Sequence, residues 1–154
     1  MIDEELLQFV SFRLGSQEFA LEILQLRRVL PYEAPVPVVG APACVAGTLR
    51  FEGETAMVLD LRARLGLPAH VTPETRLLVL DHAPVPLMLV VDAVREVARV
   101  DGGSIGGPPD VDGLTAGQAA GLIAWPGRPI VILNPARLLS ADERAALDAL
   151  VRPS

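Results

Sequence analysis

Apolar and polar residues alternate in the first part of the chain, and this alternation predicts a β-hairpin. Between residues 10 and 14 the apolar side chains of Val, Phe and Leu alternate with Ser and Arg. Strict alternation is typical of a half-buried strand, because successive side chains of a strand point to opposite faces. Residues 15–17 (GSQ) form a turn sequence, and residues 18–22 supply the second strand. We expect a short helical turn over residues 23–26 to follow.

A second hairpin is predicted around Glu52 and Gly53. Residues 48–51 and 54–59 are largely apolar and flank these two residues. A two-residue hairpin turn needs positive φ angles, which glycine adopts without steric cost. We expect a brief helix over residues 60–65 to come next, because glycine and proline follow it at the positions where helices end.

The second half of the chain predicts further strands and a long connection. Short apolar segments rich in β-branched residues are bounded there by Pro, Asp or Gly, which is the pattern of strands that end in turns. Segment 101–121 is rich in Gly, Pro and Asp and is predicted to be a long surface connection. With the first half, this gives nine or ten strands and an all-β fold with short helices. The strands expected in the second half are 76–80, 86–91, 94–100, 122–125 and 130–133.

The end of the chain predicts an α-helix that begins with a capping box. Ser140 and Glu143 have the spacing at which the serine hydroxyl accepts from a backbone N–H and the glutamate reaches back to the cap. Leu147, Leu150 and Val151 follow at helical spacing, so one face of the helix is apolar. We expect this face to pack on the protein's own strands; a helix of another protein is the alternative partner.

Composition and charge narrow the range of functions. With 154 residues, 51% of them hydrophobic, the chain is long enough to bury a core. Its net charge of −6 argues against nucleic acid or an anionic membrane surface as a partner. All 13 basic residues are arginines, so no lysine is available for Schiff-base chemistry or for a P-loop. The glycine-rich segment 102–107 is therefore interpreted as a loop.

The sequence predicts a cytoplasmic protein. The first residues (MIDEE) are acidic, whereas a signal peptide begins with basic residues. No apolar run reaches the roughly 18 residues that a membrane-spanning helix needs. The single cysteine, Cys44, permits no internal disulfide, which fits a reducing compartment. We expect Cys44 to be a small buried core residue, because free cysteine is among the most buried residue types.

Residues that could carry catalysis or bind a metal are few. His70 and His82 lie beside turn residues and are not spaced as a pair of ligands, so we expect no metal and no cofactor. We expect no enzyme; the alternative from another class is a small hydrolase that uses Asp60 or Asp92 with His82. Four aspartates stand at strand ends, where they are expected to be solvated turn caps: Asp60, Asp81, Asp92 and Asp101.

Short motifs in a fixed order run from about residue 9 to residue 150. They include FRLG at 12–15, FALEIL at 19–24, DLR at 60–62, LG at 65–66, VVDAV at 90–94 and GL at 121–122. This ordered set resembles the CheW-like family of bacterial signalling adaptors. The resemblance implies a single domain over residues 9–150, built from two packed five-stranded SH3-like β-barrels, with residues 1–8 as an N-terminal extension.

The same resemblance implies a function in signal transduction without catalysis. An adaptor of this family couples methyl-accepting chemoreceptors to a CheA-type histidine kinase, by binding the signalling tip of the receptor and the regulatory domain of the kinase. The alternatives within this class are a divergent protein that binds the receptor but not the kinase, and one that serves a non-flagellar pathway. No direct insertion into the membrane is expected.

The resemblance also points to a receptor-binding groove between the two barrels. Members of the family usually carry an acid at the position of Arg28 and a base at that of Glu52, so this chain has exchanged both signs. We hypothesise an internal Arg28–Glu52 ion pair with altered partner specificity; the alternative is that both are solvated surface charges. The expected groove residues are Leu26, Arg28, Val29, Val36, Val38, Arg50, Glu52 and Gly53.

Overall fold

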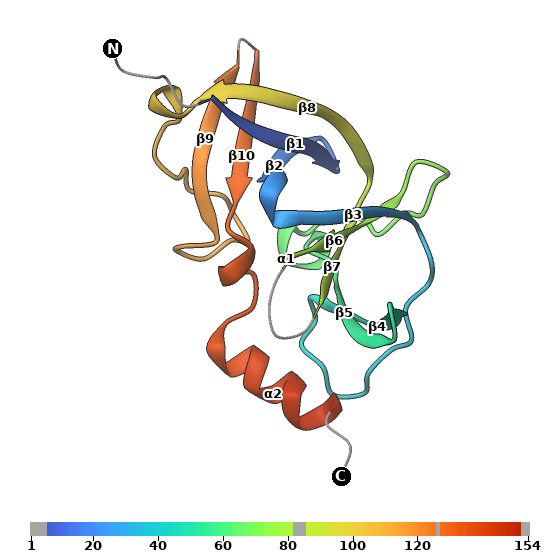
Figure 1. Cartoon of the computed structure of the whole chain (residues 1–154). Helices are drawn as coiled ribbons and strands as arrows, with labels where there is room; N and C mark the ends of the chain where they lie inside the picture. The colour runs from blue at the N-terminus through green and yellow to red at the C-terminus, as the bar shows by residue number, and fades with distance from the viewer. Residues whose placement is uncertain (1–5, 82–85, 126, 152–154) are drawn as a thin grey trace.

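The computed structural model describes residues 6–81, 86–125 and 127–151, and in this part of the chain ten strands form two five-stranded sheets. Figure 1 shows the first sheet in the upper half of the molecule and the second sheet below it. The first sheet has the order β8 (Ala93–Asp101), β1 (Leu6–Leu14), β2 (Gln17–Glu22), β10 (Arg128–Leu133), β9 (Ala119–Trp125). The second has the order β3 (Leu26–Pro31), β6 (Arg76–Leu80), β7 (Leu87–Val91), β5 (Glu54–Leu59), β4 (Val45–Phe51). The prediction of an all-β fold with two five-stranded units is confirmed.

The path of the chain interlaces the two sheets. β1 and β2 belong to the first sheet, the next five strands form the second, and the last three return to the first. Each sheet contains one parallel pair, β2 with β10 in the first and β5 with β7 in the second. The first sheet therefore forms only when the two ends of the chain come together.

A shared apolar core joins the two sheets. It combines Phe12 and Phe19 of the first sheet with Leu59 and Leu78 of the second, and all four side chains are fully buried. Burial of a side chain of this size contributes about 1.5–3 kcal/mol. Cys44 lies in the same core and is buried, as the sequence predicts. The two sheets are thus packed on each other by side chains rather than held together only by a tether.

The strand missing from the sequence prediction is β3. Its residues (LRRVLP) show no alternation, and most of them are exposed. β3 is an edge strand that pairs only with β6, so polar side chains are tolerated on it and the period-two signal is lost. The helical turn expected before it is present as a 3-10 helix, η1 (Ile23–Gln25).

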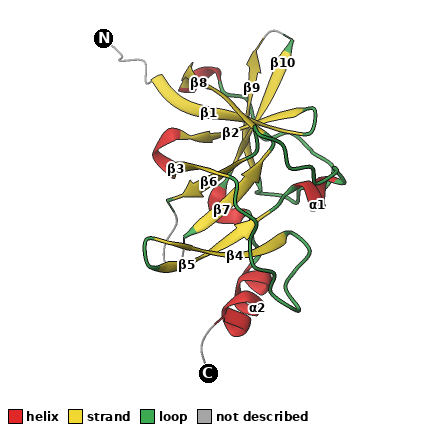
Figure 2. Ribbon diagram, turned by 90° about the vertical axis from the view of Figure 1, so that its right-hand side faces the viewer, coloured by secondary structure: helices red, strands yellow, loops and turns green. Residues whose placement is uncertain are grey.

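Short helices connect the strands, and one longer helix ends the described chain. α1 (Arg62–Leu65) begins two residues later than expected and ends at Gly66, whose φ is 68°. The 3-10 helices η2 (Gly102–Ser104) and η3 (Pro135–Arg137) flank β9 and β10 in sequence. α2 (Ala141–Val151) lies at the end of the molecule where the second sheet is, as Figures 1 and 2 show from two directions. Within the described ranges, no helix is long and apolar enough to cross a membrane.

Candidate functional site

The strand β3 places two predicted groove residues at the rim between the sheets. Across the β3–β6 pairing, Leu26 is opposite Leu80 and Val29 is opposite Leu78. Opposite residues share a face of a sheet, and both leucines of β6 belong to the shared core. Leu26 and Val29 therefore lie on the inner face of β3; Leu26 is half-buried, whereas Val29 is 41% exposed.

A second group of site residues spans the gap between the two edge strands of the second sheet, β3 and β4. Arg27 Nη2 lies 2.7 Å from Glu52 Oε2, and Arg28 Nη2 lies 3.7 Å from Glu52 Oε1. Both guanidinium groups also lie over the ring of Phe51, with Cζ at 5.3 and 5.6 Å from its centroid. We call Arg27, Arg28, Phe51 and Glu52 the seam cluster, because its side chains bridge strands that no backbone ladder joins.

The ion pair expected between Arg28 and Glu52 is present, but it is the longer of two. The shorter pair uses Arg27, which the sequence analysis did not consider. In a regular strand, neighbouring side chains point to opposite faces, so only one of two adjacent arginines could reach the same carboxylate. The β3–β6 register shifts between Leu26 and Arg28, and this irregularity brings both arginines to Glu52.

Glu52 occupies a strained position in the turn between β4 and β5. Its φ is 48°, and it is the one non-glycine residue with positive φ among the described residues; Gly53 follows with φ of 80°. A left-handed conformation costs an ordinary residue about 1–2 kcal/mol. The two-residue turn is the one that the sequence predicts, but its glutamate adopts the conformation that glycine or asparagine would adopt at lower cost.

The remaining groove residues form separate contacts. Val36 exchanges two backbone hydrogen bonds with Thr48 of β4, each 2.9 Å long, and its side chain is 65% exposed. This close approach requires Gly47, where an added Cβ would lie 2.2 Å from the Val36 carbonyl oxygen. Arg50 donates to the Gly53 carbonyl oxygen at 3.1 Å, and Val38 is half-buried. The predicted groove residues thus lie on or beside β3 and β4, the two edge strands of the second sheet, in three groups. We call the side on which these two strands approach each other the β3–β4 edge.

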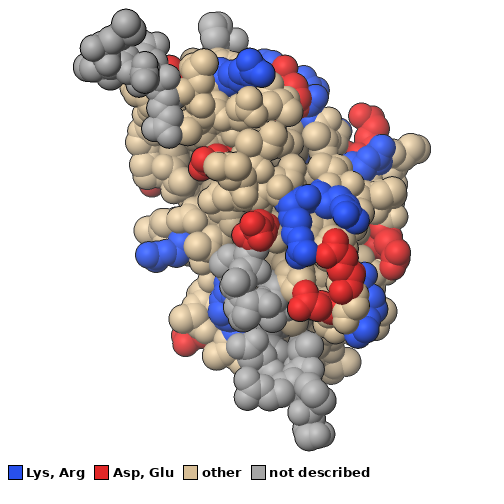
Figure 3. Space-filling model, in the orientation of Figure 1, with Lys and Arg blue, Asp and Glu red and all other residues tan. Residues whose placement is uncertain are grey.

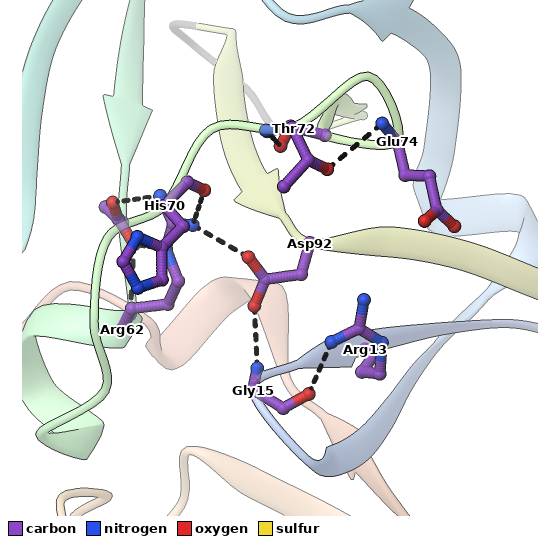
Figure 4. A network of polar contacts seen from close by, with 9 residues as sticks. Arg13, Gly15, Arg62, His70, Thr72, Glu74 and Asp92 are labelled. Carbon is purple, nitrogen blue, oxygen red and sulfur yellow. Dashed lines mark hydrogen bonds and ion pairs between the residues drawn. The ribbon is translucent and has the colours of Figure 1, made fainter.

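A buried arginine joins the two sheets at a different place. The side chain of Arg62, only 2% exposed, donates to both carboxylate oxygens of Asp60 at 2.8 and 2.9 Å and to Asp92 Oδ1 at 2.8 Å. Asp92 Oδ2 in turn accepts from the Gly15 backbone N–H at 2.6 Å. Figure 4 shows Asp92 between the Arg62 guanidinium and Gly15. Because Asp60 follows β5 and Gly15 belongs to the β1–β2 hairpin, this network ties the second sheet to the first.

The network corrects the expectation for two of the four aspartates. Asp60 and Asp92 are not solvated but are mostly buried ion-pair partners, with side chains 16% and 14% exposed. Asp60 does cap a turn, because its Oδ1 accepts from the Arg62 backbone N–H at 3.0 Å. The hydrogen bond with Asp60 is the main cause that raises the pKa of Arg62, against the opposing effect of burial. Asp101 does cap a turn, since its carboxylate accepts from the Gly103 N–H at 3.0 Å. The motif DLR is visible in the sequence, but the partners of its arginine are not.

Two observations concern the hydrolase alternative and the possibility of a metal site. Both carboxylates of the hydrolase alternative are hydrogen-bonded to Arg62, while His82 lies outside the described residues. Over the described residues, no three His, Cys, Asp or Glu side chains lie close enough together to hold a metal ion.

The helix α2 is fixed to the second sheet through its first turn. The capping box is confirmed: the Ser140 hydroxyl accepts from the Glu143 N–H, and the Glu143 carboxylate accepts from the Ser140 N–H, both at 3.0 Å. The same carboxylate pairs with Arg64 of α1 at 2.5 Å, beside the Cys44 sulfur. Burial opposes ionisation, but the hydrogen bonds from Ser140 and Arg64 prevail and lower the pKa of Glu143. The expected contacts of Leu147, Leu150 and Val151 lie outside the described side chains.

The chain and its fold match known proteins. A family model for the CheW-like domain matches residues 8–143. The chemotaxis protein CheW of Rhizobium meliloti is 28% identical over 141 residues, which cover 90% of this chain and 91% of that protein. The chemotaxis protein CheW of Bacillus subtilis is 26% identical over 104 residues, or 67% of each chain.

A solved structure agrees with the fold. The crystal structure of the scaffolding protein TtCheW from Thermoanaerobacter tengcongensis superposes with a TM-score of 0.82 at 22% identity, and the match covers 92% of each chain. The fold and the motifs define a two-lobed, β-rich domain of the kind found in bacterial signalling. Because the family model covers most of the chain, the protein belongs to the CheW-like family.

Proposed function

We propose that this protein is a non-catalytic adaptor of the cytoplasm that couples methyl-accepting chemoreceptors to a CheA-type histidine kinase. The observation that carries the proposal is the CheW-like match over residues 8–143. The proteins most like this chain include chemotaxis proteins and a scaffolding protein.

We assign the receptor tip to the β3–β4 edge, which carries the predicted groove residues. Monomeric proteins rarely leave apolar side chains clustered in water unless the cluster binds something. Of the seven large apolar side chains that are exposed in the described chain, four lie between residues 24 and 39. The proposed receptor-binding residues are those predicted from the sequence: Leu26, Arg28, Val29, Val36, Val38, Arg50, Glu52 and Gly53.

The kinase takes other surfaces of the same domain in this proposal. Residues 9–150 act as one unit, because the first sheet is built from both ends of the chain. Two further candidates are an adaptor that binds the receptor but not the kinase, and one that serves a pathway other than flagellar chemotaxis. The exchanged signs of Arg28 and Glu52 favour an altered choice of partner.

Size-exclusion chromatography with purified components tests the proposal. The protein is mixed separately with a soluble fragment of a receptor signalling tip and with the regulatory domain of the kinase, both from the source organism. We expect it to co-elute with each and to allow receptors to stimulate kinase autophosphorylation. Co-elution with the receptor fragment alone would favour the receptor-only adaptor, and co-elution with neither would refute the proposal.

A further inference from the structure

The seam cluster holds an arginine in place while leaving its hydrogen-bond donors unused. The Arg28 side chain is 56% exposed, yet its guanidinium is fixed over Phe51 and beside Glu52. Across the part of the chain that the structure describes, this guanidinium donates no hydrogen bond, because its distance of 3.7 Å to Glu52 makes only an ion pair. A guanidinium has five N–H donors. Arg28 is therefore oriented and able to bind a further acceptor.

The charge around Arg28 is positive, although the chain as a whole is acidic. Arg27 and Arg28 share one carboxylate, that of Glu52, and Arg50 and Glu54 lie beside it at the end of the β4–β5 hairpin. Three arginines and two acids give this edge a local charge of about +1, against −6 for the whole chain. Figure 3 shows basic side chains gathered over the region of β3, with acidic ones directly beside them. Glu52, the one acid of the seam cluster, is neutralised by its ion pairs with Arg27 and Arg28.

We propose that Arg27 and Arg28 bind a carboxylate of the docking segment, so that the receptor tip taken by this protein carries an acidic side chain where it meets β3. This inference rests on the proposed function. Arginine binds carboxylates through two parallel hydrogen bonds, which fixes both distance and direction. The exposed side chains of Val29 and Val36 on the same edge receive the apolar part of that segment.

A basic docking segment fits this edge poorly. It would meet three arginines and would have to compete with Arg27 and Arg28 for the Glu52 carboxylate. Like charges brought together in a desolvated contact weaken binding, whereas an opposite charge both strengthens it and speeds association. Within this set of receptor-binding residues, Glu52 thus acts as a positioning residue that orients the arginines.

Isothermal titration calorimetry measures the inference directly. The probes are soluble signalling-tip fragments of the source organism's methyl-accepting receptors, each also prepared with its tip Asp and Glu residues changed to Asn and Gln. The full chain is compared with the double variant Arg27→Gln/Arg28→Gln. We expect the double variant to raise Kd at least about tenfold, which corresponds to the loss of one ion contact of moderate strength. The amide form of the tip should raise Kd as much, and the two changes together should add little more.

Two further variants separate recognition from loss of structure. Arg99→Gln alters an exposed arginine of β8, on the other sheet, and should leave Kd unchanged. Arg28→Lys keeps the charge but loses the paired donors, so its Kd should lie between those of the wild type and the double variant. Thermal unfolding of each variant identifies any that fail to fold.

The outcomes distinguish the inference from the function on which it rests. If the wild type binds a tip but the double variant binds it equally or more tightly, the acidic-partner inference is wrong and the adaptor function stands. The same holds if the amide tip binds as well as the original. If the wild type binds no tip fragment at all, the adaptor function fails and the inference fails with it.

Discussion

Two of the arginine–carboxylate networks of this protein, that of Arg62 between the sheets and that of the seam cluster, differ chiefly in their access to water. At the joint between the sheets, the Arg62 side chain is 2% exposed and its donors are used by Asp60, Asp92 and a carbonyl oxygen. In the seam cluster, the side chains of Arg27 and Arg28 are 42% and 56% exposed, and most of their donors have no acceptor among the described residues. A buried charge must be fully paired, whereas an exposed one contributes little to stability. The first network therefore maintains the fold, and the second is available for recognition.

Removal of Arg62 should show the difference between the two networks most clearly. Arg62→Met leaves the mostly buried carboxylates of Asp60 and Asp92 without their partner, which costs about 3–5 kcal/mol of folding free energy. Urea unfolding followed by circular dichroism gives this value. The matched control is Arg27→Met, an exposed arginine, for which we expect a loss below about 1 kcal/mol. Equal losses in the two variants would mean that burial does not separate the networks.

Beside the seam cluster, the close approach of two backbone segments should contribute more to the free energy of unfolding than the exposed charges of the cluster do. Gly47 has φ of 149°, and a Cβ there would meet the Val36 carbonyl oxygen. Gly47→Ala should therefore displace the segment after β3 and cost about 1–3 kcal/mol. Urea unfolding measures the loss, and faster hydrogen exchange at the amides of Val36 and Thr48, which are hydrogen-bonded to each other's residues, should locate it. Gly53→Ala serves as a control for space, because nothing lies within 4 Å of its added Cβ, although its positive φ also carries a cost.

The ion pair of Arg64 and Glu143 is an intermediate case, because its side chains are more exposed than that of Arg62 and less exposed than those of the seam cluster. Glu143→Gln keeps the capping geometry but loses the charge, and should cost about 1 kcal/mol near neutral pH. The folded state lowers the pKa of Glu143. Its contribution is therefore complete above the ordinary glutamate pKa of about 4.3 and is lost as the pH falls through the lower folded value. Urea unfolding of both proteins from pH 7 downward should show the difference vanish only at the acid end; a constant difference would contradict this origin.

The sequence predicts most strands but not the partners of its charges. The alternating segments and the glycine turns are local signals, and nine strands follow from them. β3 is missed because an edge strand exposes its polar residues, and Arg27 is missed because the register shift beside it has no local sequence signal. The role of Arg62 depends on Asp92, 30 residues away, and on Gly15 of the other sheet. Such contacts are set by tertiary packing, so only the motif and not its function is visible in the sequence.

The smallest effect on stability is expected at Glu52, because the seam cluster should affect binding of the partner rather than stability of the fold. Glu52→Asn removes both exposed ion pairs, each worth about 1 kcal/mol or less. It also places at φ of 48° a residue that tolerates the left-handed conformation far better. These effects oppose each other, so the free energy of unfolding should change by less than about 1 kcal/mol. The arginines, however, lose the group that orients them, and binding of the receptor tip should weaken while urea unfolding stays nearly the same. A variant that is destabilised as much as Arg62→Met would show instead that the seam, like the joint, maintains the fold.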